Sequence, residues 1–409
     1  MARFIHSADW QLGARFKQFG TKGDVLRKAR LATLRRALEL AQKKTVDAFL
    51  IAGDLFEDNQ VEDSLVATVI DLFREFESVP IHILPGNHDP ITGPESVWKR
   101  KLFLQSPGHI HVLTEPGVTE LGHDAFLLAS PLQQKLSTTD PSLRLVDLAK
   151  DIPADKIKIG ITHGALAIEA KHQPNDFPIA LNAASRAGLD YLAIGHWHNW
   201  LAETDGGRIV LPGTPEPDRF SNERSGNVAY VEIDGPGILP RVEAVSVATL
   251  TWRSLGLDFL TQESSRASLD RALAGLRATA AKTVMRITLS GNVSPQVVAE
   301  VKAELAKTGE GFFLHQIVDS TRIELTAAER ADLKARHPIL AQVLADIDQL
   351  EGFATGSSPS VSEQVTTPLT LTEAQALLVP VKIDIAQLTP EWFAKLRQTL
   401  FQTLQEVAS

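Results

Sequence analysis

The sequence predicts a layered α/β domain, followed by a small α+β module and a helical C-terminal tail. Over roughly the first 235 residues, short apolar strands alternate with helical stretches, which is the pattern of an α/β domain. Beyond this point the spacing of strands and helices changes, and a segment rich in Gly, Ser, Thr and Pro precedes a final amphipathic helix. A chain of 409 residues is also too long for one ordinary domain.

The expected strands of the first domain are short apolar runs that are followed by polar residues or glycine. They cover residues 3–7, 46–52, 81–84, 125–128, 157–162, 191–194, 209–211 and 228–233. Helices are expected between the early strands, one capped by Asp24 and one over Val61–Phe76. Open α/β sheets bind ligands at the carboxyl ends of their strands, so the residues that follow these strands are candidates for a site.

The remaining chain divides by composition into four segments. These are an α+β capping or DNA-binding module over 236–325, a helical segment over 326–351, a flexible linker over 352–370 and C-terminal helices over 371–409. Thr326 to Glu329 form a capping box, and Pro338 is expected to interrupt the helix that follows. The apolar stripe of the tail would usually be core. Beyond a flexible linker it has little core to join, which favours a partner groove.

Composition excludes several classes of site. The chain has no cysteine, so disulfides, thiolate metal sites and cysteine nucleophiles are excluded, and any metal must use carboxylates, amides or some of the 12 histidines. A net charge of −9 argues against a surface coated in positive charge for nucleic acid. There is no long apolar run and no signal-peptide core at the start, so a cytoplasmic protein without a membrane segment is expected.

Short polar clusters follow five of the expected strands. In chain order they are Asp9-Trp10-Gln11, Gly53-Asp54, Gly86-Asn87-His88-Asp89, His163-Gly164 and Gly195-His196-Trp197-His198. Their carboxylate, amide and imidazole groups suit manganese, iron or zinc better than calcium. Such a set can hold two metal ions that share one carboxylate. The pair could clamp a phosphate and lower the pKa of a bound water, which would then attack phosphorus.

The order of these clusters and the residue types in them resemble the motifs of the calcineurin-like metallophosphoesterase superfamily. Those motifs are D-x-H, G-D, G-N-H-D, H and G-H-x-H. Within this superfamily, the segments FIHSADWQLG, IAGDLFE and LPGNHDP resemble the SbcD-type DNA-repair nucleases. The resemblance implies a layered β-sandwich domain flanked by helices. It also implies DNA as substrate, an SMC-type ATPase of the SbcC type bound by the C-terminal helices, and frequent homodimers.

The resemblance also assigns roles to the matched residues. Asp9 and His198 would bind the first metal, Asn87, His163 and His196 the second, and Asp54 would bridge both ions. Manganese is the expected metal, with magnesium, iron or zinc as alternatives. His88 would contact the phosphate and stabilise or protonate the leaving oxygen. Glu57 occupies the position of a carboxylate that orients this histidine in related phosphatases.

Gln11 departs from the family pattern, because an amide stands where D-x-H has an imidazole. An amide is a weaker donor than imidazole toward transition metals. Either Gln11 still binds a weak, manganese-dependent site, or that site is often empty and activity is reduced or altered. The other ligands are intact, which favours a working enzyme over a non-catalytic scaffold.

The first 44 residues contain a marked excess of Lys and Arg. These residues could hold DNA phosphates, or they could be the solvated face of a helix. Arg15 and Lys17 are the better candidates because they follow the first metal loop, and Arg219 lies in a loop that resembles one bordering the active site in SbcD-type proteins. Trp197 and Trp200 could stack on a nucleobase or pack on the sheet.

The function expected from these residues is that of a metal-dependent DNA nuclease, one subunit of an SbcCD-like repair complex. The first alternative is a phosphoesterase for small molecules on the same fold. The additional residues beyond the catalytic domain count against it, because a small substrate needs no such platform. The second alternative is a non-catalytic scaffold in which Gln11 marks decay of the site.

Overall fold

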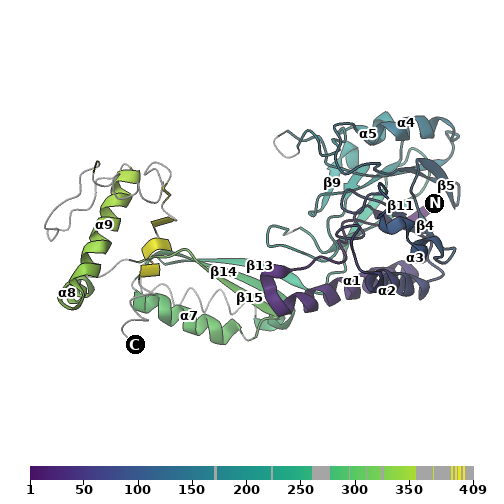
Figure 1. Ribbon diagram of the computed structural model, residues 1–409. Coiled ribbons are helices and arrows are strands. Elements are labelled where there is room, and N and C mark those ends of the chain that lie inside the picture. Colours follow the sequence, from purple (N-terminus) through teal and green to yellow (C-terminus); the bar gives the residue numbers. More distant parts are fainter. Residues whose placement is uncertain are drawn as a thin grey trace. The chain divides into compact units, whose positions relative to one another are not determined.

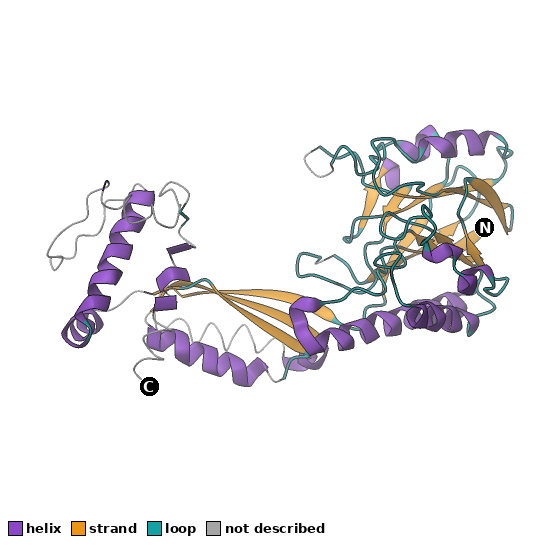
Figure 2. Cartoon of the chain, viewed as in Figure 1, coloured by secondary structure: helices purple, strands orange, loops and turns teal. Residues whose placement is uncertain are grey.

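The structure is a computed structural model and forms two compact units, Met1–Trp252 and Arg253–Ser409. It describes residues 1–169, 173–222, 224–259, 277–293, 295–309, 311–323, 327–355, 372, 388–389, 392–393, 395–397 and 399–400. The expected fold class, a mixed α/β fold with helices flanking layered sheets, is confirmed (Figures 1 and 2).

The first unit contains a six-stranded sheet with the strand order β12-β11-β1-β2-β3-β4. Its strands are β1 (Ala2–Ser7), β2 (Ala48–Ala52), β3 (Ile81–Leu84), β4 (Ile110–Val112), β11 (Asn227–Ile233) and β12 (Arg241–Ser246). The four from β1 to β4 are parallel, and β11 and β12 are antiparallel additions at one side. β12 lies beyond residue 235 and still pairs with β11, so the compact first unit extends past that position.

A second six-stranded sheet has the order β5-β6-β7-β8-β10-β9. Its strands are β5 (Gly117–Gly122), β6 (Ala125–Ser130), β7 (Ile157–His163), β8 (Tyr191–Gly195), β9 (Leu201–Thr204) and β10 (Ile209–Leu211). The strands β6, β7, β8 and β10 are parallel, so their carboxyl ends lie at one edge of the sheet. The expected strands of the first domain are all present, while β4, β5 and β9 lie at sheet edges and were not expected.

Helices cover the outer faces of the two sheets. α1 (Gly23–Lys44), α2 (Asp63–Arg74) and α3 (Lys101–Leu104) lie on one side, and α4 (Leu143–Lys150) and α5 (Ala183–Arg186) lie on the other (Figure 1). The first unit also has three described 3-10 turns, η1 (Lys17–Lys22), η2 (Val97–Lys99) and η3 (Asp205–Gly207), and the second unit has η4 (Arg277–Lys282).

Alternation of apolar side chains along the strands explains the layering. In β2, Phe49 and Ile51 belong to the core beneath α1 and α2, whereas Leu50 belongs to the core between the two sheets. Successive side chains of a strand point to opposite faces, so a strand that is apolar at every position must be covered on both. A third core, which includes Leu192 and Ile194 of β8, lies under α4 and α5.

The second unit contains a smaller sheet. β13 (Thr251–Phe259), which begins at the end of the first unit, pairs with β14 (Thr283–Val293), followed by β15 (Leu314–Asp319), and β16 (Arg322–Ile323) also pairs with β14. The helix α7 (Pro295–Gly309) supplies Val301 and Leu305 to the core of this sheet. The expected break at Pro338 is confirmed, because α8 (Ala327–Arg336) ends just before α9 (Pro338–Thr355) begins.

The linker begins later than the sequence predicts. Residues 352–355 are helical and complete α9, because Phe353 and Ala354 pack with Ile347 and Leu350 in one apolar cluster. Residues 356–370 of the predicted linker and most of the predicted C-terminal helices lie outside the described residues. The same holds for Thr326, the first residue of the predicted capping box.

The tail residues that the structure describes have a core to join. Leu388 and Phe393 are buried in the α9 cluster, and Trp392, Leu396 and Leu400 pack against it. Arg397 forms ion pairs with Asp348 and Glu351 of α9 at 2.7 and 2.6 Å. The expectation that the apolar stripe lacks a core is therefore wrong for these side chains, because α9 supplies one.

Within the part of the chain that the structure describes, no helix is both long enough and apolar enough to cross a membrane.

Candidate metal centre

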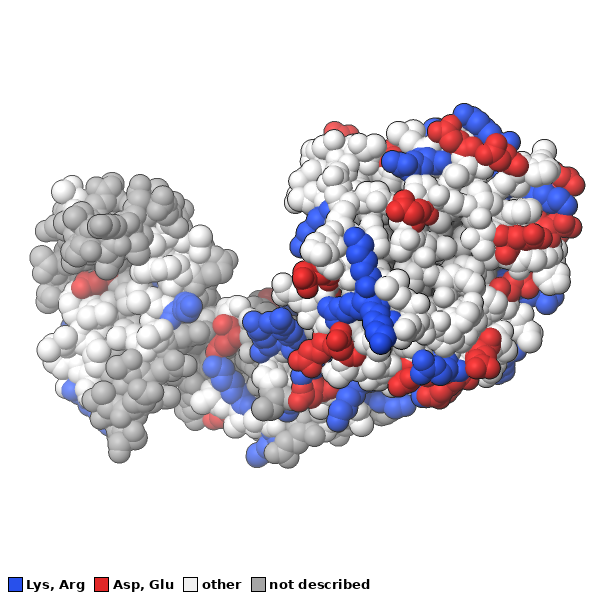
Figure 3. All heavy atoms as spheres, turned by 45° about the vertical axis from the view of Figure 1, so that its right-hand side comes forward, with Lys and Arg blue, Asp and Glu red and all other residues white. Residues whose placement is uncertain are grey.

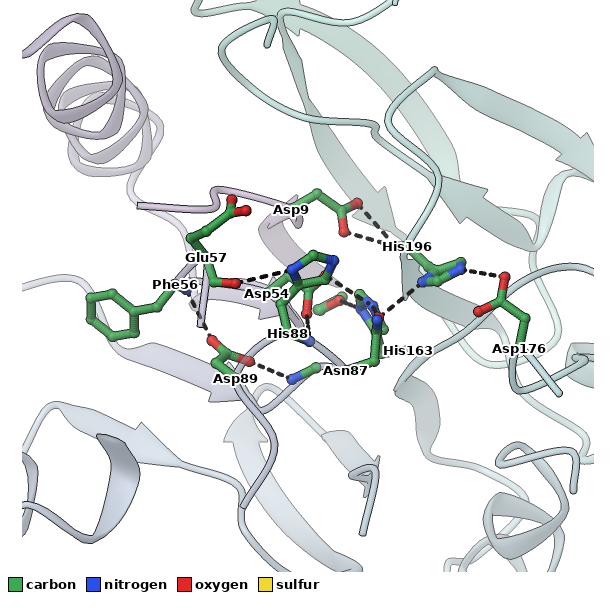
Figure 4. A network of polar contacts seen from close by, with 12 residues as sticks. Asp9, Asp54, Phe56, Glu57, Asn87, His88, Asp89, His163, Asp176 and His196 are labelled. Carbon is green, nitrogen blue, oxygen red and sulfur yellow. Dashed lines mark hydrogen bonds and ion pairs between the residues drawn. The ribbon is translucent and has the colours of Figure 1, made fainter. Parts of the chain in front are cut away.

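The polar clusters meet at the carboxyl ends of strands from both sheets. Asp9 follows β1, Asp54 follows β2 and Asn87 follows β3, while His163 ends β7 and His196 follows β8. Figure 4 shows these side chains converging from the two sheets. The chain brings together residues 187 positions apart, since the His196 N–H donates to both carboxylate oxygens of Asp9 at 2.9 and 3.0 Å.

Left-handed backbone at three positions shapes the first two loops. Asp9, Gln11 and Asp54 have φ angles of 54°, 41° and 54°. Main-chain hydrogen bonds join the loops, with Asp9 N–H donating to Gly53 at 3.1 Å and Gln11 N–H donating to Asp54 at 2.9 Å. Such φ values are uncommon for residues other than glycine and persist where surrounding structure enforces them.

Two glycines leave the space that the ligands occupy. A Cβ atom at Gly53 would overlap Nδ1 of His163, and one at Gly86 would overlap Oδ1 of Asp54. Gly53 also has a φ of +92°. The G-D and G-N-H-D motifs therefore need glycine because the side chains of other motifs fill the position of its missing Cβ.

Four side chains converge as the expected ligands of the second metal. Nδ1 of His163 donates to the main-chain oxygen of Ala52 at 2.8 Å, so Nε2 faces inward. Oδ1 of Asn87 lies 2.9 Å from that Nε2 and 3.0 Å from Nδ1 of His196. Oδ2 of Asp54 is 3.4 Å from Nε2 of His163.

Asp9, Asp54 and His163 are buried, and one ligand atom from each lies within 4.8 Å of the others. Asp9 also lies close enough to His198 for its charge to help raise the pKa of that imidazole. Gln11 is buried in the same loop. Its main-chain N–H donates to the carbonyl of Asp54, and its own carbonyl accepts the N–H of Ala14 at 3.2 Å.

Three carboxylates that were not assigned roles from the sequence support these residues. Asp176 Oδ2 lies 2.8 Å from Nε2 of His196, and Asp218 Oδ2 lies 3.2 Å from Nδ1 of His198. Asp89 accepts N–H groups from Phe56 at 2.9 Å and from Gly86 at 2.8 Å, which ties the G-N-H-D loop to the G-D loop. Carboxylates that bind the far nitrogen of a histidine fix its tautomer and raise its basicity.

His88 is oriented by the main chain rather than by a side chain. Its Nδ1 lies 3.0 Å from the carbonyl oxygen of Glu57, and its N–H donates to Asp54 Oδ1 at 2.9 Å. Figure 4 shows the Glu57 carboxylate directed away from the imidazole. The expectation that the Glu57 carboxylate makes this contact is therefore wrong, because the turn after Asp54 presents the carbonyl instead.

Burial and charge oppose each other in this centre. Burial favours neutral groups, yet the negative charge of Asp54 raises the pKa of His163 to about 9, and the charge of His163 in turn holds the pKa of Asp54 well below its ordinary value. Burial, reinforced by the charge of Asp54, raises the pKa of Asp89 to about 7. Asp54 is therefore ionised at neutral pH, as a metal ligand must be.

Arg30 of α1 is a buried cation behind the first metal loop. Its Nη1 donates to the main-chain oxygen of Trp10 at 2.7 Å, while Nε and Nη2 have no partner among the described residues. Burial lowers the pKa of this guanidinium, and the charges of Asp218 and Glu216 counteract that effect. Arg30 thus braces the loop that carries Asp9 and Gln11.

These side chains fit divalent metal binding. One ligand atom from each of Asp9, Asp54 and His163 lies within 4.8 Å of the others, and Gly53 and Gly86 leave room for the side chains of His163 and Asp54. This donor set suits borderline transition metals.

The three residues expected to contact DNA, Arg15, Lys17 and Arg219, are not brought together as the expected metal ligands are. Arg219 forms an ion pair at 3.4 Å with Asp218, the partner of His198, whereas Arg15 and Lys17 are exposed on the segment before α1. Several other basic residues of the first 44 have partners inside the protein, as with Arg35 on Glu75 and Arg36 on the carbonyl of Ala248. On the face that Figure 3 shows, blue and red side chains are mixed, and several blue side chains lie together near the middle of the picture.

The fold and this centre define a metal-dependent phosphoesterase. Residues 2–200 match the calcineurin-like phosphoesterase family, and through them the chain belongs to the calcineurin-like metallophosphoesterase superfamily. The matched region includes every predicted metal ligand and His88.

Curated relatives are similar at low identity. The chain is 20% identical over 369 residues to a protein named uncharacterized metallophosphoesterase YhaO from Bacillus subtilis, a match that covers 85% of this chain and 87% of that one. It is 24% identical over 261 residues to the DNA double-strand break repair protein Mre11 from Sulfurisphaera tokodaii, covering 60% of this chain and 62% of that protein. The second match thus spans less than two thirds of the repair protein.

Among solved structures, a dimetal phosphatase from Danio rerio is similar at 13% identity and a TM-score of 0.35, covering 60% of this chain and 99% of that one. A likeness this low does not bear on function.

Proposed function

We propose that this chain is a metal-dependent nuclease that hydrolyses phosphodiester bonds of DNA. The observation that carries the proposal is the convergence of Asp54, Asn87, His163 and His196 at one position, with Asp9 and His198 beside them. The choice of DNA is supported by the SbcD-type segments of the sequence and by the similarity to a protein named for DNA double-strand break repair.

The proposed roles are those that the SbcD-type resemblance implies. Asp54, Asn87, His163 and His196 would hold one ion, and Asp9, Asp54 and His198 the other, with Gln11 as an additional ligand. Bound divalent ions would neutralise phosphate charge and lower the pKa of water. His88, held at Nδ1 by the Glu57 carbonyl, would present Nε2 to the phosphate and stabilise or protonate the leaving oxygen. Manganese is the proposed metal.

The test compares labelled DNA with a generic aryl phosphodiester in the presence of Mn²⁺. Wild type, Asp54→Asn and the exposed control Asp151→Asn are assayed side by side. The proposal expects wild type and the control to cleave both substrates and Asp54→Asn to cleave neither. Cleavage of the aryl ester alone would identify a phosphoesterase for small molecules. A wild type as inert as Asp54→Asn would identify a non-catalytic scaffold.

We further propose that the chain works as a homodimer with an SMC-type ATPase of the SbcC type. The SbcD-type resemblance supports this assignment. Some apolar tail residues pack on α9, so a partner that binds here would contact the combined surface of α9 and the tail. Co-purification with a co-expressed SbcC-type ATPase tests the pairing, and deletion of residues 371–409 is expected to abolish it.

A further inference from the structure

A cavity of about 590 Å³ adjoins the metal centre. Its walls come mainly from two segments, the one that follows β8 and the one that precedes β11, and Ile168 adds a side from the loop after β7. The side chains that matter for its chemistry are His196, Trp197, His198, Trp200, Arg219 and Arg224. Two expected metal ligands thus form part of its wall, so a molecule in this cavity lies next to the position expected for the scissile phosphate.

The walls are fixed by hydrogen bonds between the two segments. Trp200 N–H donates to the carbonyl of Arg224 at 3.0 Å, and Arg224 N–H donates to Oδ1 of Asn199 at 3.0 Å. Asn222 Nδ2 donates to Oδ1 of Asp218 at 2.6 Å, and Asp218 also holds His198. The cavity therefore exists before any ligand arrives, which lowers the entropic cost of binding.

Two tryptophan side chains line the cavity, and each also packs against a hydrophobic core of the first unit. Trp197 packs against the core under α4 and α5, and Trp200 packs against the core between the sheets. Both are only partly buried and both line the cavity. A ring that is anchored on one side offers a flat apolar surface at little loss of rotamer freedom, which is how proteins stack bases of single strands.

The cavity is cationic at its rim. The Arg219 side chain is 62% exposed although it pairs with Asp218, and Arg224 is exposed. Guanidinium groups bind phosphate oxygens and also stack on bases. The wall of one cavity therefore combines aromatic side chains, two arginines and two of the expected metal ligands.

We propose that this cavity is a nucleoside subsite. It takes the base of a nucleotide next to the scissile phosphate against Trp197 and Trp200, and Arg219 and Arg224 contact the flanking phosphate. The proposal rests on the proposed nuclease function and adds that cleavage depends on a base at one defined position. A phosphate or simple alkyl ester would leave the indoles uncovered.

Binding is measured first, on the full metal-free chain, with the dinucleotide TpT as the probe. Trp200→Leu is expected to weaken TpT binding about 5- to 150-fold, the range for loss of one stacked base, and Trp200→Phe to restore most of it. Arg224→Gln is expected to weaken binding, whereas Arg208→Gln, a matched change outside the cavity, is not. Equal affinity of Trp200→Leu and wild type for TpT would overturn the subsite.

Cleavage by the wild-type enzyme gives a readout that needs no variant. Oligonucleotides with one abasic nucleotide at successive positions are cleaved in Mn²⁺, and the proposal expects slow cleavage at one register only. Uniform cleavage at every register would overturn the subsite while leaving the nuclease function intact. TpT binding that is lost in Trp200→Leu, without cleavage of any phosphodiester, would retain the subsite and overturn the nuclease function.

A further substrate distinguishes a nucleoside that is part of a DNA chain from a nucleoside in a small ester. A nitrophenyl ester of thymidine monophosphate offers the base without a DNA chain. Base-dependent cleavage of the oligonucleotide supports the proposal as stated. Base-dependent cleavage of the nucleotide ester alone would keep the nucleoside subsite and overturn its assignment to DNA.

Discussion

Nε2 of His196 lies 2.8 Å from a carboxylate oxygen of Asp176, while Nδ1 of the same ring faces Oδ1 of Asn87 at 3.0 Å. The carboxylate accepts a hydrogen bond from the protonated Nε2 and thereby leaves the lone pair of Nδ1 directed at the centre. Asp176 thus decides which nitrogen of His196 is available to a metal.

Replacing Asp176 with Asn should weaken metal binding without unfolding the chain. An amide can rotate to offer either an oxygen or an NH₂ group, so it no longer fixes the tautomer of His196. Loss of such a partner lowers metal affinity by about 10- to 100-fold. Mn²⁺ titration by calorimetry checks this, with the exposed Asp151→Asn as control. Unchanged Mn²⁺ affinity in Asp176→Asn would show that Asn87 and His163 alone orient the ring.

His88 and Glu57 should differ sharply in their sensitivity to substitution. His88→Asn removes the imidazole that faces the phosphate, and turnover should fall by about 10²- to 10³-fold with Mn²⁺ affinity retained. Glu57→Gln keeps the carbonyl that holds His88, so turnover should fall by less than about threefold. Steady-state hydrolysis of an aryl phosphodiester measures both. Comparable losses in the two variants would show that the carboxylate acts directly.

The side chain at position 11 tests whether the first metal site binds Mn²⁺ weakly or has lost its function. Gln11 is 4% exposed and joined to Asp54 through its main chain, so an imidazole at this position would replace the amide within the same loop. Gln11→His should raise Mn²⁺ affinity and turnover, since imidazole is the stronger donor. Gln133→His, which adds an exposed imidazole elsewhere, serves as control. No gain in either quantity would rule out the weak-site interpretation.

Much of the centre could be predicted because its ligands lie in local motifs that follow strands. Asp54 and Asn87 lie two and three residues after the ends of β2 and β3, so the strand pattern places them at one edge. Asp176 and Asp218 lie in long loops, and nothing in their spacing reveals which histidine they reach. The contact of His88 uses a main-chain carbonyl, which the identity of Glu57 cannot report. The packing of Phe393 on α9 was missed because it joins segments far apart in the chain.

Gly53→Ala should remove the site and destabilise the fold together. The added methyl would overlap Nδ1 of His163, and the φ of +92° is strained for any side chain. A loss of about 2 kcal/mol or more in unfolding free energy is expected, with loss of Mn²⁺ binding. Gly93→Ala is the matched control, because Gly93 has a φ of +87° and no atom within 4 Å of the added methyl. It should cost about 1 kcal/mol and keep Mn²⁺ binding. Equal effects of the two changes would attribute the loss to backbone strain alone.

His6 joins the two sheets beneath the site. It lies on β1, and its Nδ1 is 2.8 Å from the hydroxyl of Tyr191 on β8, while Nε2 has no partner among the described residues. Burial lowers the pKa of His6 from 6.5 to about 3. The folded state therefore binds this proton less readily than the unfolded chain. Stability from neutral His6 is complete above about pH 6.5 and is lost as the pH falls toward 3.

Removing this imidazole should reduce the loss of unfolding free energy that occurs as the pH falls. At about 1.4 kcal/mol per pH unit, neutral His6 accounts for a loss of about 2 kcal/mol between pH 6.5 and pH 5. Urea unfolding of metal-free wild type and His6→Gln, at about pH 7 and about pH 5, measures the difference between the two losses. His123→Gln, whose imidazole is 67% exposed, should follow wild type at both pH values. If His6→Gln loses as much stability as wild type, then other buried groups cause the acid sensitivity. A smaller loss would identify the contact between the sheets as the element that senses acid.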